Sequence, residues 1–131
     1  MRKAPALTSR LSFLYTGNMT THEMRLHPGP FGNIEAGTQV IESRLNDEKR
    51  QEIKVGDHIV FALRPDFIEK VEVEVVELLH APTFSELFSM RPLAEFGADN
   101  LEEKVQSMYE YYPKEDESKH GVLGIKFITQ K

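Results

Sequence analysis

The clearest hydrophobic pattern in the chain is the alternation of valine and glutamate in "KVEVEVVELLHA", residues 70–81. Its first three valines share one parity, which predicts a β-strand with one apolar face. Val76 and Leu78 then take the opposite parity, so the pattern slips by one residue. This slip indicates a β-bulge near Val75 and Val76, and such bulges help a sheet to curl toward a small barrel.

Four further stretches are rich in β-favouring residues and predict short strands. They are "THEMRLH", "TQVIESRL", "HIVFAL" and "VLGIKFIT", at residues 21–27, 38–45, 58–63 and 122–129. Proline follows two of them, at the "PGP" of residues 28–30 and at Pro65. Because proline lacks a backbone N–H, these positions are expected to end the strands.

Three segments have the spacing and caps of short helices. "FGNIEAG" closes on Gly37, since glycine accepts the left-handed conformation at a helix end, and "TFSELFSM" opens with a capping box from Thr83 to Glu86. "NLEEKVQSMYEYY" follows the cap residue Asn100 with an apolar face of Leu101, Val105, Met108 and Tyr112. About five strands and three short helices, in this mixed order, predict an α+β fold: a partly open β-barrel with helices at one end.

Composition indicates a single soluble domain. The 131 residues are 40% hydrophobic and 28% charged, with a mean hydropathy of −0.42. No apolar run approaches the roughly 20 residues needed to cross a bilayer, so a membrane-spanning protein is excluded. The absence of cysteine excludes disulfides and thiolate metal sites and fits a reducing compartment. We therefore expect a cytoplasmic protein without a membrane partner.

Charge is distributed unevenly. A formal net charge of −5 argues against nonspecific coating by nucleic acid, although a local basic patch is compatible with it. Residues 1–18 carry basic side chains and no acidic one. We interpret them as an N-terminal extension, disordered or loosely docked, with an ordered extra strand or helix and a targeting peptide as alternatives. Residues 19–131 then form the domain.

The sequence contains no strong motif for metal or covalent chemistry. The five histidines fall on separate elements or on opposite faces of a strand, without metal-binding spacing. There is no G-x-S-x-G elbow and no glycine-rich phosphate loop. We therefore expect no metal site and no cofactor. The aromatic run "YEYY" could stack on bases, but core packing of Tyr109 and Tyr112 is the favoured interpretation, with Tyr111 exposed.

The stretch "GTQVIESR", residues 37–44, is the strongest candidate for a binding surface. Strand alternation places Ile41 and Leu45 on the core side and projects Glu42 and Arg44 away from it. By pattern alone, an exposed ion pair is the favoured interpretation and a cleft wall is the alternative. Lys49, Arg50 and Lys54 follow in a polar connection that also carries acidic residues.

The order of these features resembles an ASCH domain (activating signal cointegrator homology) of the small bacterial type. The resemblance rests on "GTQVIESRLNDEKRQEIKVGDHIVF", the valine-rich strand, "TFSEL" and "YYPKEDESKHGVLGIKF". It implies a barrel related to PUA domains, with a cleft that receives RNA or a nucleoside. The family pattern around that cleft is glycine, any residue, lysine, two residues, glutamate, any residue and arginine. This chain matches it at Gly37, Glu42 and Arg44 but has Gln39 at the lysine position.

Some members of the family resemble amidohydrolases of acetylcytidine. The resemblance implies that these members use that lysine for catalysis, together with a threonine at the position of Glu42 and a glutamate. The glutamate aligns near Gly97, whose acidic neighbours in this chain are Glu95 and Asp99. This chain reproduces none of the three cleanly. Gln39 cannot titrate, but its amide offers both a hydrogen-bond donor and an acceptor, which suits the edge of a base.

The leading hypothesis is therefore binding of RNA or a small nucleotide-like ligand. Gln39, Glu42 and Arg44 would line the cleft, and Lys49 and Arg50 would contact phosphate. One alternative is a hydrolase that acts on acetylcytidine or RNA with a non-standard site. Another is a regulatory module that binds a protein, since fold alone does not determine function.

Overall fold

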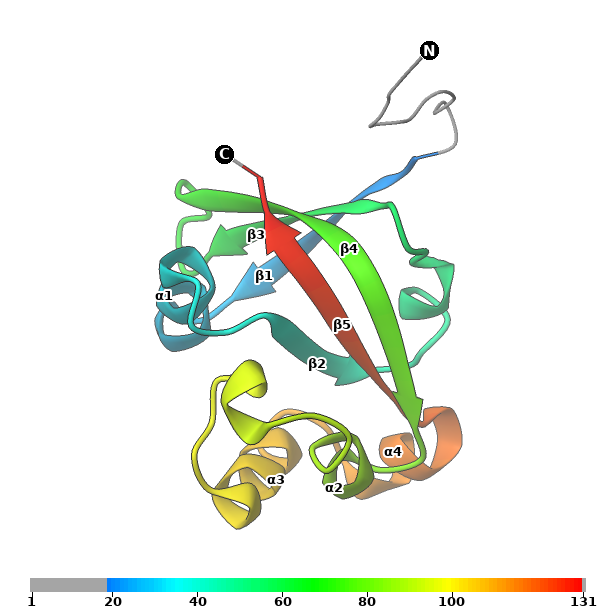
Figure 1. Ribbon diagram of the computed structural model, residues 1–131. Helices are drawn as coiled ribbons and strands as arrows, with labels where there is room; N and C mark the ends of the chain where they lie inside the picture. The colour runs from blue at the N-terminus through cyan, green and yellow to red at the C-terminus, as the bar shows by residue number, and fades with distance from the viewer. Residues whose placement is uncertain (1–18, 131) are drawn as a thin grey trace.

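The computed structural model describes residues 19–130, so the extension predicted for residues 1–18 lies outside the described residues. Five strands form one mixed sheet in the order β1-β3-β4-β5-β2 (Figure 1). The strands are β1 Thr21–Leu26, β2 Ile41–Leu45, β3 His58–Leu63, β4 Lys70–Ala81 and β5 Val122–Thr129. β1 pairs with β3 in parallel, and the other three pairs are antiparallel. β1 and β2 are thus the two edges of the sheet.

The sheet is curled, as the valine pattern predicted. Pairing of β4 with β5 shifts register between Val75 and Glu77, which confirms the bulge. A bulge increases local twist and bends the strand, and β4 curves strongly in Figure 1. The prediction of an α+β, partly open barrel of about five strands is confirmed. The barrel is open between its two edge strands, β1 and β2.

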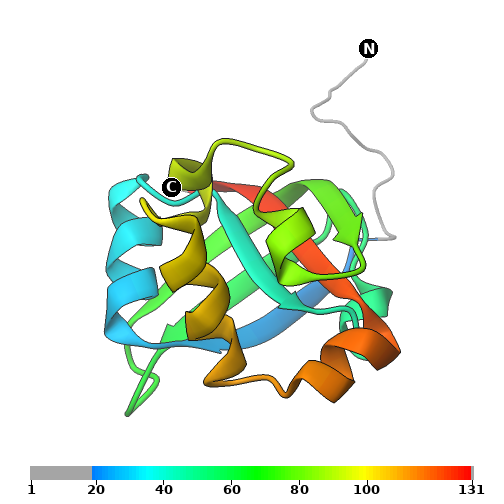
Figure 2. The ribbon, with the colours of Figure 1, turned by 90° about the horizontal axis from the view of Figure 1, so that it is seen from below.

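Apolar side chains form two clusters, one on each side of the curled sheet. The first lies under helix α1 Pro28–Ala36 and includes Phe31, Ile34, Phe61 and Phe127. The second lies under the helices of residues 84–120, which gather at one end of the sheet (Figures 1 and 2). It includes Phe84, Leu87 and Phe96, all fully buried, and Met108.

The helical segments follow their predicted caps. α2 Phe84–Leu87 begins after Thr83, whose hydroxyl oxygen accepts a hydrogen bond from the backbone N–H of Glu86 at 3.1 Å. α3 Leu101–Tyr109 begins after Asn100, whose side chain accepts from the N–H of Glu103 at 2.9 Å. Two 3-10 turns, η1 Arg50–Glu52 and η2 Leu93–Phe96, complete the connections. One detail of the predicted apolar face is corrected, because Leu101 is 40% exposed.

The sequence did not predict α4 Lys114–His120, which lies in the charged stretch "KEDESKHG". Its dominant anchor is the buried Glu117 carboxylate. This carboxylate accepts hydrogen bonds from the backbone N–H of Phe84 at 2.8 Å and from the Tyr109 hydroxyl at 2.9 Å. α4 is thereby tied to the start of α2 and the end of α3. Among residues 19–130, no helix is long and apolar enough to cross a membrane.

Candidate functional site

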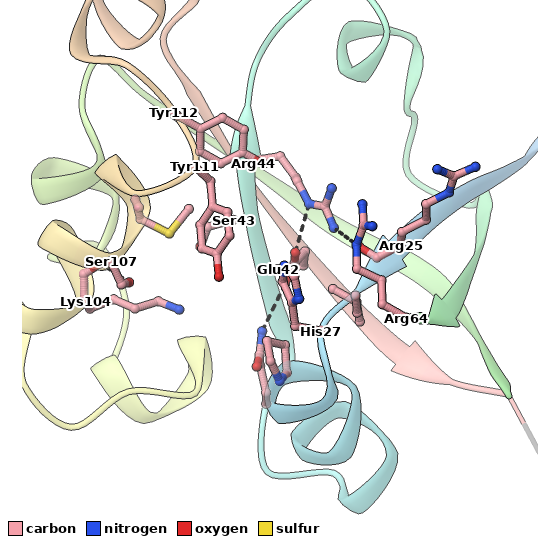
Figure 3. A pocket seen from close by; sticks show the side chains of 14 residues that line it. Arg25, His27, Glu42, Ser43, Arg44, Arg64, Lys104, Ser107, Tyr111 and Tyr112 are labelled. Atoms are coloured by element: carbon pink, nitrogen blue, oxygen red, sulfur yellow. Dashed lines mark hydrogen bonds and ion pairs between the residues drawn. The ribbon is translucent and has the colours of Figure 1, made fainter. Parts of the chain in front are cut away.

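A pocket of about 350 Å³ runs along the free edge of β2 (Figure 3). One wall comes from α3 and the following residues Tyr111 and Tyr112. The opposite wall comes from β1, the start of α1 and Arg64 at the end of β3. The pocket therefore lies at the open seam of the barrel, where side chains from three parts of the fold converge. A concave site on which polar groups converge is the usual form of a small-ligand site.

Glu42 and Arg44 form a buried ion pair on β2. The Arg44 Nε atom donates to Glu42 Oε2 at 2.9 Å, and each side chain is 11% exposed. The expectation of an exposed, solvated pair is therefore wrong, because β2 is covered on both faces. Removing either partner of such a buried pair is strongly destabilising, because the other partner is left as an uncompensated buried charge.

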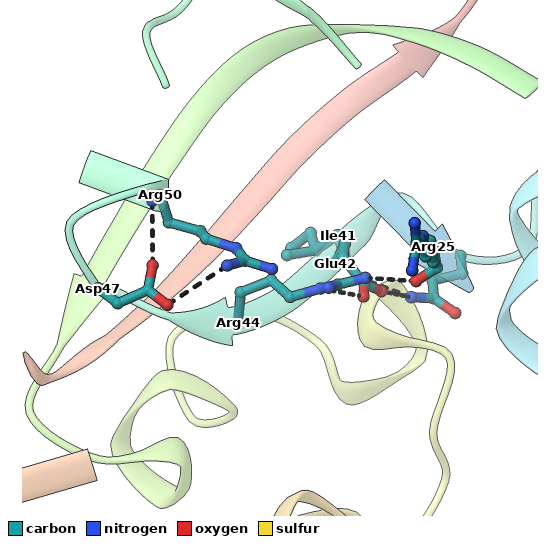
Figure 4. Close-up of polar contacts among 7 residues, drawn as sticks. Arg25, Ile41, Glu42, Arg44, Asp47 and Arg50 are labelled. Atoms are coloured by element: carbon teal, nitrogen blue, oxygen red, sulfur yellow. Dashed lines mark hydrogen bonds and ion pairs between the residues drawn. The ribbon is translucent and has the colours of Figure 1, made fainter. Parts of the chain in front are cut away.

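Arg44 also spans the seam between the two edge strands. Its NH2 group donates to the backbone carbonyl oxygen of Arg25, on β1, at 3.0 Å (Figure 4). Burial of the guanidinium tends to lower the pKa of Arg44, but the Glu42 carboxylate and neighbouring Tyr112 outweigh it and raise the pKa above the ordinary value. The side chain therefore stays charged and holds β2 to β1 where no backbone pairing does so.

Gln39 lies beside this pair and is almost fully buried. Its Nε2 donates to Glu42 Oε1 at 3.2 Å and to the Ile41 carbonyl oxygen at 3.0 Å. A Cβ atom added to Gly97 would lie 2.6 Å from Gln39 Oε1, and Gly97 has a φ of +77°. Position 97, where the resemblance aligns a glutamate, thus has no room for a side chain while Gln39 keeps this position.

Ser43 adds an unpaired polar group to the pocket. The residue is 6% exposed, and within residues 19–130 its hydroxyl has no hydrogen-bond partner. A buried hydroxyl without a partner costs about 1 to 3 kcal/mol. Ser43 also lines the pocket, so a ligand there lies beside the residue that carries this hydroxyl.

A lysine reaches the pocket from the opposite wall. Lys104, on α3, lines the pocket together with Ser107 one turn later (Figure 3). Burial lowers the pKa of Lys104 below its ordinary value, and the negative charge of Glu42 partly opposes that shift. The pocket therefore contains an amine, although position 39 does not supply it.

The aromatic run divides as the sequence predicted. Tyr109 and Tyr112 pack against the second apolar cluster, and Tyr111 is 59% exposed. Tyr111 nevertheless lines the pocket, and its ring lies 5.4 Å from that of His27, centroid to centroid. The two rings bring the helical wall and the start of α1 together at the pocket mouth. A base-stacking surface is therefore available there.

Lys49 and Arg50 are not among the side chains that line the pocket. Arg50 donates to Asp47 at 3.3 Å, beyond the end of β2 (Figure 4), and Lys49 is exposed just before η1. Their contact with phosphate stays a prediction. Glu95 and Asp99, the acidic neighbours of Gly97, also lie outside the lining. No cluster of three metal-binding side chains occurs within the described residues.

Sequence reasoning missed the parts of the site that come from other elements. Besides Gln39, Glu42 and Arg44, the polar lining includes Ser43 on β2 itself and, from other parts of the fold, Arg25, His27, Arg64, Lys104 and Ser107. The spacing of Lys104 and Ser107, three apart on one helix, was a usable signal because such residues share a face. No local signal connects Arg25 of β1, or Arg64 just after β3, with β2, since only the curl of the sheet brings them together.

Comparison with known families supports the resemblance seen in the sequence. The family model described as ASCH domain matches residues 24–130. A comparison with curated proteins finds no significant match.

Among solved structures, the chain is similar to "hypothetical protein PH0355", with 31% identity, a TM-score of 0.76 and coverage of 85% of this chain and 100% of that one. Protein PF0455 from Pyrococcus furiosus has 28% identity and a TM-score of 0.67, over 86% and 99% of the two chains. A mutant ASCH protein from Zymomonas mobilis has 14% identity and a TM-score of 0.56, over 83% and 66%. At that identity the likeness concerns the fold alone.

Proposed function

The chain belongs to the ASCH domain family, and on this premise we propose that it binds RNA or a small nucleotide-like ligand in the pocket beside β2. The observation that carries the proposal is the convergence of Gln39, Glu42, Ser43 and Arg44 on one pocket. Donors and acceptors of this kind read the polar edges of an exposed base. The nearby Tyr111 ring offers a stacking surface.

The roles follow from the groups that each side chain leaves available. Glu42 uses its two oxygens for Gln39 and Arg44 but retains further lone pairs that can accept from an exocyclic amine. Arg44 commits Nε and NH2, and within residues 19–130 its NH1 group makes no hydrogen bond that would compete with a ligand. The Ser43 hydroxyl can donate or accept, depending on its rotation. Together they favour a base with both an amino group and a carbonyl group.

Replacing Ser43 with alanine tests this proposal without disturbing the ion pair. We expect affinity for the best ligand in a panel of ribonucleosides and short single-stranded RNAs to fall about five- to tenfold, as for the loss of one hydrogen bond of about 1 kcal/mol. The free energy of unfolding should stay the same or rise, because the unliganded protein loses a buried group that lacks a partner. Isothermal titration and urea denaturation measure the two quantities.

The matched control is Ser118→Ala, on the exposed face of α4 and outside the pocket lining. It should change neither affinity nor stability. Unchanged affinity in Ser43→Ala would count against the role of Ser43, and failure of the wild-type chain to bind any member of the panel would refute ligand binding in this pocket.

A second candidate function is amide hydrolysis of a modified nucleoside such as acetylcytidine. Lys104 favours it, because burial lowers the pKa of this amine and so increases its neutral fraction. The neutral amine would take a proton from a water that attacks the acetyl carbonyl carbon. The C–N bond would then break, with the proton passed to the leaving amine to give acetate and cytidine.

This candidate predicts release of cytidine from acetylcytidine, measured by chromatography. Lys104→Met should lower the rate about 10²- to 10⁴-fold, as expected for loss of a general base, while exposed Lys119→Met on α4 should not. Release no faster than in buffer, or an equal rate in Lys104→Met, would exclude the hydrolase and leave the binding function intact.

A further inference from the structure

The pocket differs in charge from the chain as a whole. The full sequence has a formal net charge of −5. Around the pocket, by contrast, one carboxylate, Glu42, faces four cationic side chains: Arg25, Arg44, Arg64 and Lys104. A concave surface lined mainly by one sign of charge focuses its field and attracts the opposite sign. The pocket therefore favours an anionic ligand over a neutral one.

Arg25 and Arg64 are available to a ligand in a way that Arg44 is not. Arg44 is bound to Glu42 and to the Arg25 carbonyl oxygen. Within residues 19–130, no carboxylate pairs with the guanidinium of Arg25 or of Arg64. Both side chains line the pocket on the wall opposite α3 (Figure 3). Among the described residues, nothing else takes up their N–H donors, which leaves these donors for a ligand.

Phe67 positions this arginine pair. The guanidinium carbon of Arg25 lies 4.6 Å from the centroid of the Phe67 ring, and that of Arg64 lies 5.9 Å from it. Stacking of a guanidinium on an aromatic face uses its π surface and leaves its in-plane donors available. Two guanidiniums held in this way can both donate hydrogen bonds to the oxygens of one tetrahedral oxyanion, such as phosphate.

The backbone of Phe67 is itself unusual. Its φ is +61°, in the left-handed region that side chains other than glycine rarely adopt. Such a conformation costs about 1 to 3 kcal/mol and is retained where surrounding contacts impose it, often at ligand sites. Here the Phe67 N–H donates to the Leu63 carbonyl oxygen at 2.9 Å, which closes the turn and presents the ring to both arginines.

We propose that Arg25 and Arg64, stacked on Phe67, form a phosphate subsite, so that the pocket takes a phosphorylated nucleotide in preference to a free nucleoside. This inference rests on the proposed function and extends it, because it names the chemical class of the ligand. The base occupies the part of the pocket at Gln39 and Glu42, and the phosphate contacts the arginine pair. The phosphate can belong to a mononucleotide or to a phosphodiester within RNA.

Titration of the full chain with matched ligands tests the subsite. The probes are the four ribonucleosides, their 5′- and 3′-monophosphates, and the corresponding dinucleoside monophosphates. We expect a phosphorylated form to bind at least about tenfold more tightly than its parent nucleoside at low salt. The monophosphates and the phosphodiesters separate the two sources of phosphate. Arg25→Gln/Arg64→Gln should abolish the preference, so that the phosphorylated form and its parent nucleoside bind with equal affinity.

Two controls separate a built subsite from general charge. Lys54→Gln/Lys119→Gln removes the same charge from exposed positions outside the pocket and should keep the preference. Phe67→Leu keeps both charges and the apolar bulk but lacks the aromatic face, so the preference should fall several-fold. Equal affinity of the wild-type chain for nucleoside and nucleotide would overturn the subsite alone. An equal loss in the lysine control would also overturn it, and absence of all binding would overturn both proposals.

Discussion

Replacing Arg44 with methionine is expected to lower the free energy of unfolding by about 3 to 5 kcal/mol, the usual cost of removing one partner from a buried ion pair. Methionine preserves much of the aliphatic part of the arginine side chain. Most of the loss of stability therefore comes from the Glu42 carboxylate, which is left buried without its cation. The bridge to the Arg25 carbonyl oxygen is lost as well. Urea denaturation at neutral pH measures the change. Affinity for the best nucleoside should also fall by at least about tenfold.

The control for this prediction is the double variant Glu42→Gln/Arg44→Met. It removes both charges, so no uncompensated ion remains, and we expect it to recover most of the lost stability. Nucleoside binding should not recover, because the ligand loses contacts from both side chains. A loss below about 1 kcal/mol in Arg44→Met would mean that the pair behaves as an exposed one, and the seam would not depend on it.

The strands were predictable because their information is local. In β4 the valine and glutamate pattern gave both the strand and the bulge, since alternation reports directly which face is buried. The caps of α2 and α3 were predictable for the same reason, because Thr83 and Asn100 bond to backbone N–H groups three residues away. A sheet that carries a bulge in its longest strand is expected to curl, and that expectation gave the partly open barrel.

α4 was not predictable from a hydrophobic pattern because it has almost none. "KEDESKH" contains no apolar residue at all. The helix is held instead by the Glu117 carboxylate, whose hydrogen-bond partners lie on α2 and at the end of α3. A buried carboxylate of this kind appears in the sequence as one more charged residue. Its role becomes visible only when tertiary contacts are known.

The site shows the same division between local and non-local information. Strand parity and family resemblance located Glu42 and Arg44, but parity alone assigned them to solvent. They are buried because α3 and β1 close over the free edge of β2, which no property of the β2 sequence encodes. Lys104 reaches the pocket by the same closure. The missing lysine at position 39 therefore does not imply the absence of an amine from the site.

Replacing Glu117 with leucine is expected to lower the free energy of unfolding by about 3 kcal/mol, because the substitution leaves two donors without their acceptor. One is the buried N–H of Phe84, and the other is the Tyr109 hydroxyl. Tyr109 ends α3, which supplies Lys104, Ser107 and Met108 to the pocket. Nucleoside affinity should therefore fall along with stability. Urea denaturation and titration of the same protein samples measure both effects.

The Tyr109 hydroxyl also makes the stability of the protein depend on pH. Burial, and then the Glu117 carboxylate, raise the pKa of the Tyr109 hydroxyl above its ordinary value of 10.0. The folded state therefore retains this proton after the unfolded chain has lost it, so its contribution to stability is complete below about pH 10 and is lost as pH rises further. Tyr109→Phe should abolish this loss of stability above about pH 10, and it should lower the free energy of unfolding at neutral pH by about 1 kcal/mol. Glu117→Gln, which keeps an acceptor oxygen, should lose less than Glu117→Leu. Equal stability of Glu117→Leu and wild type would show that α4 is held by other contacts.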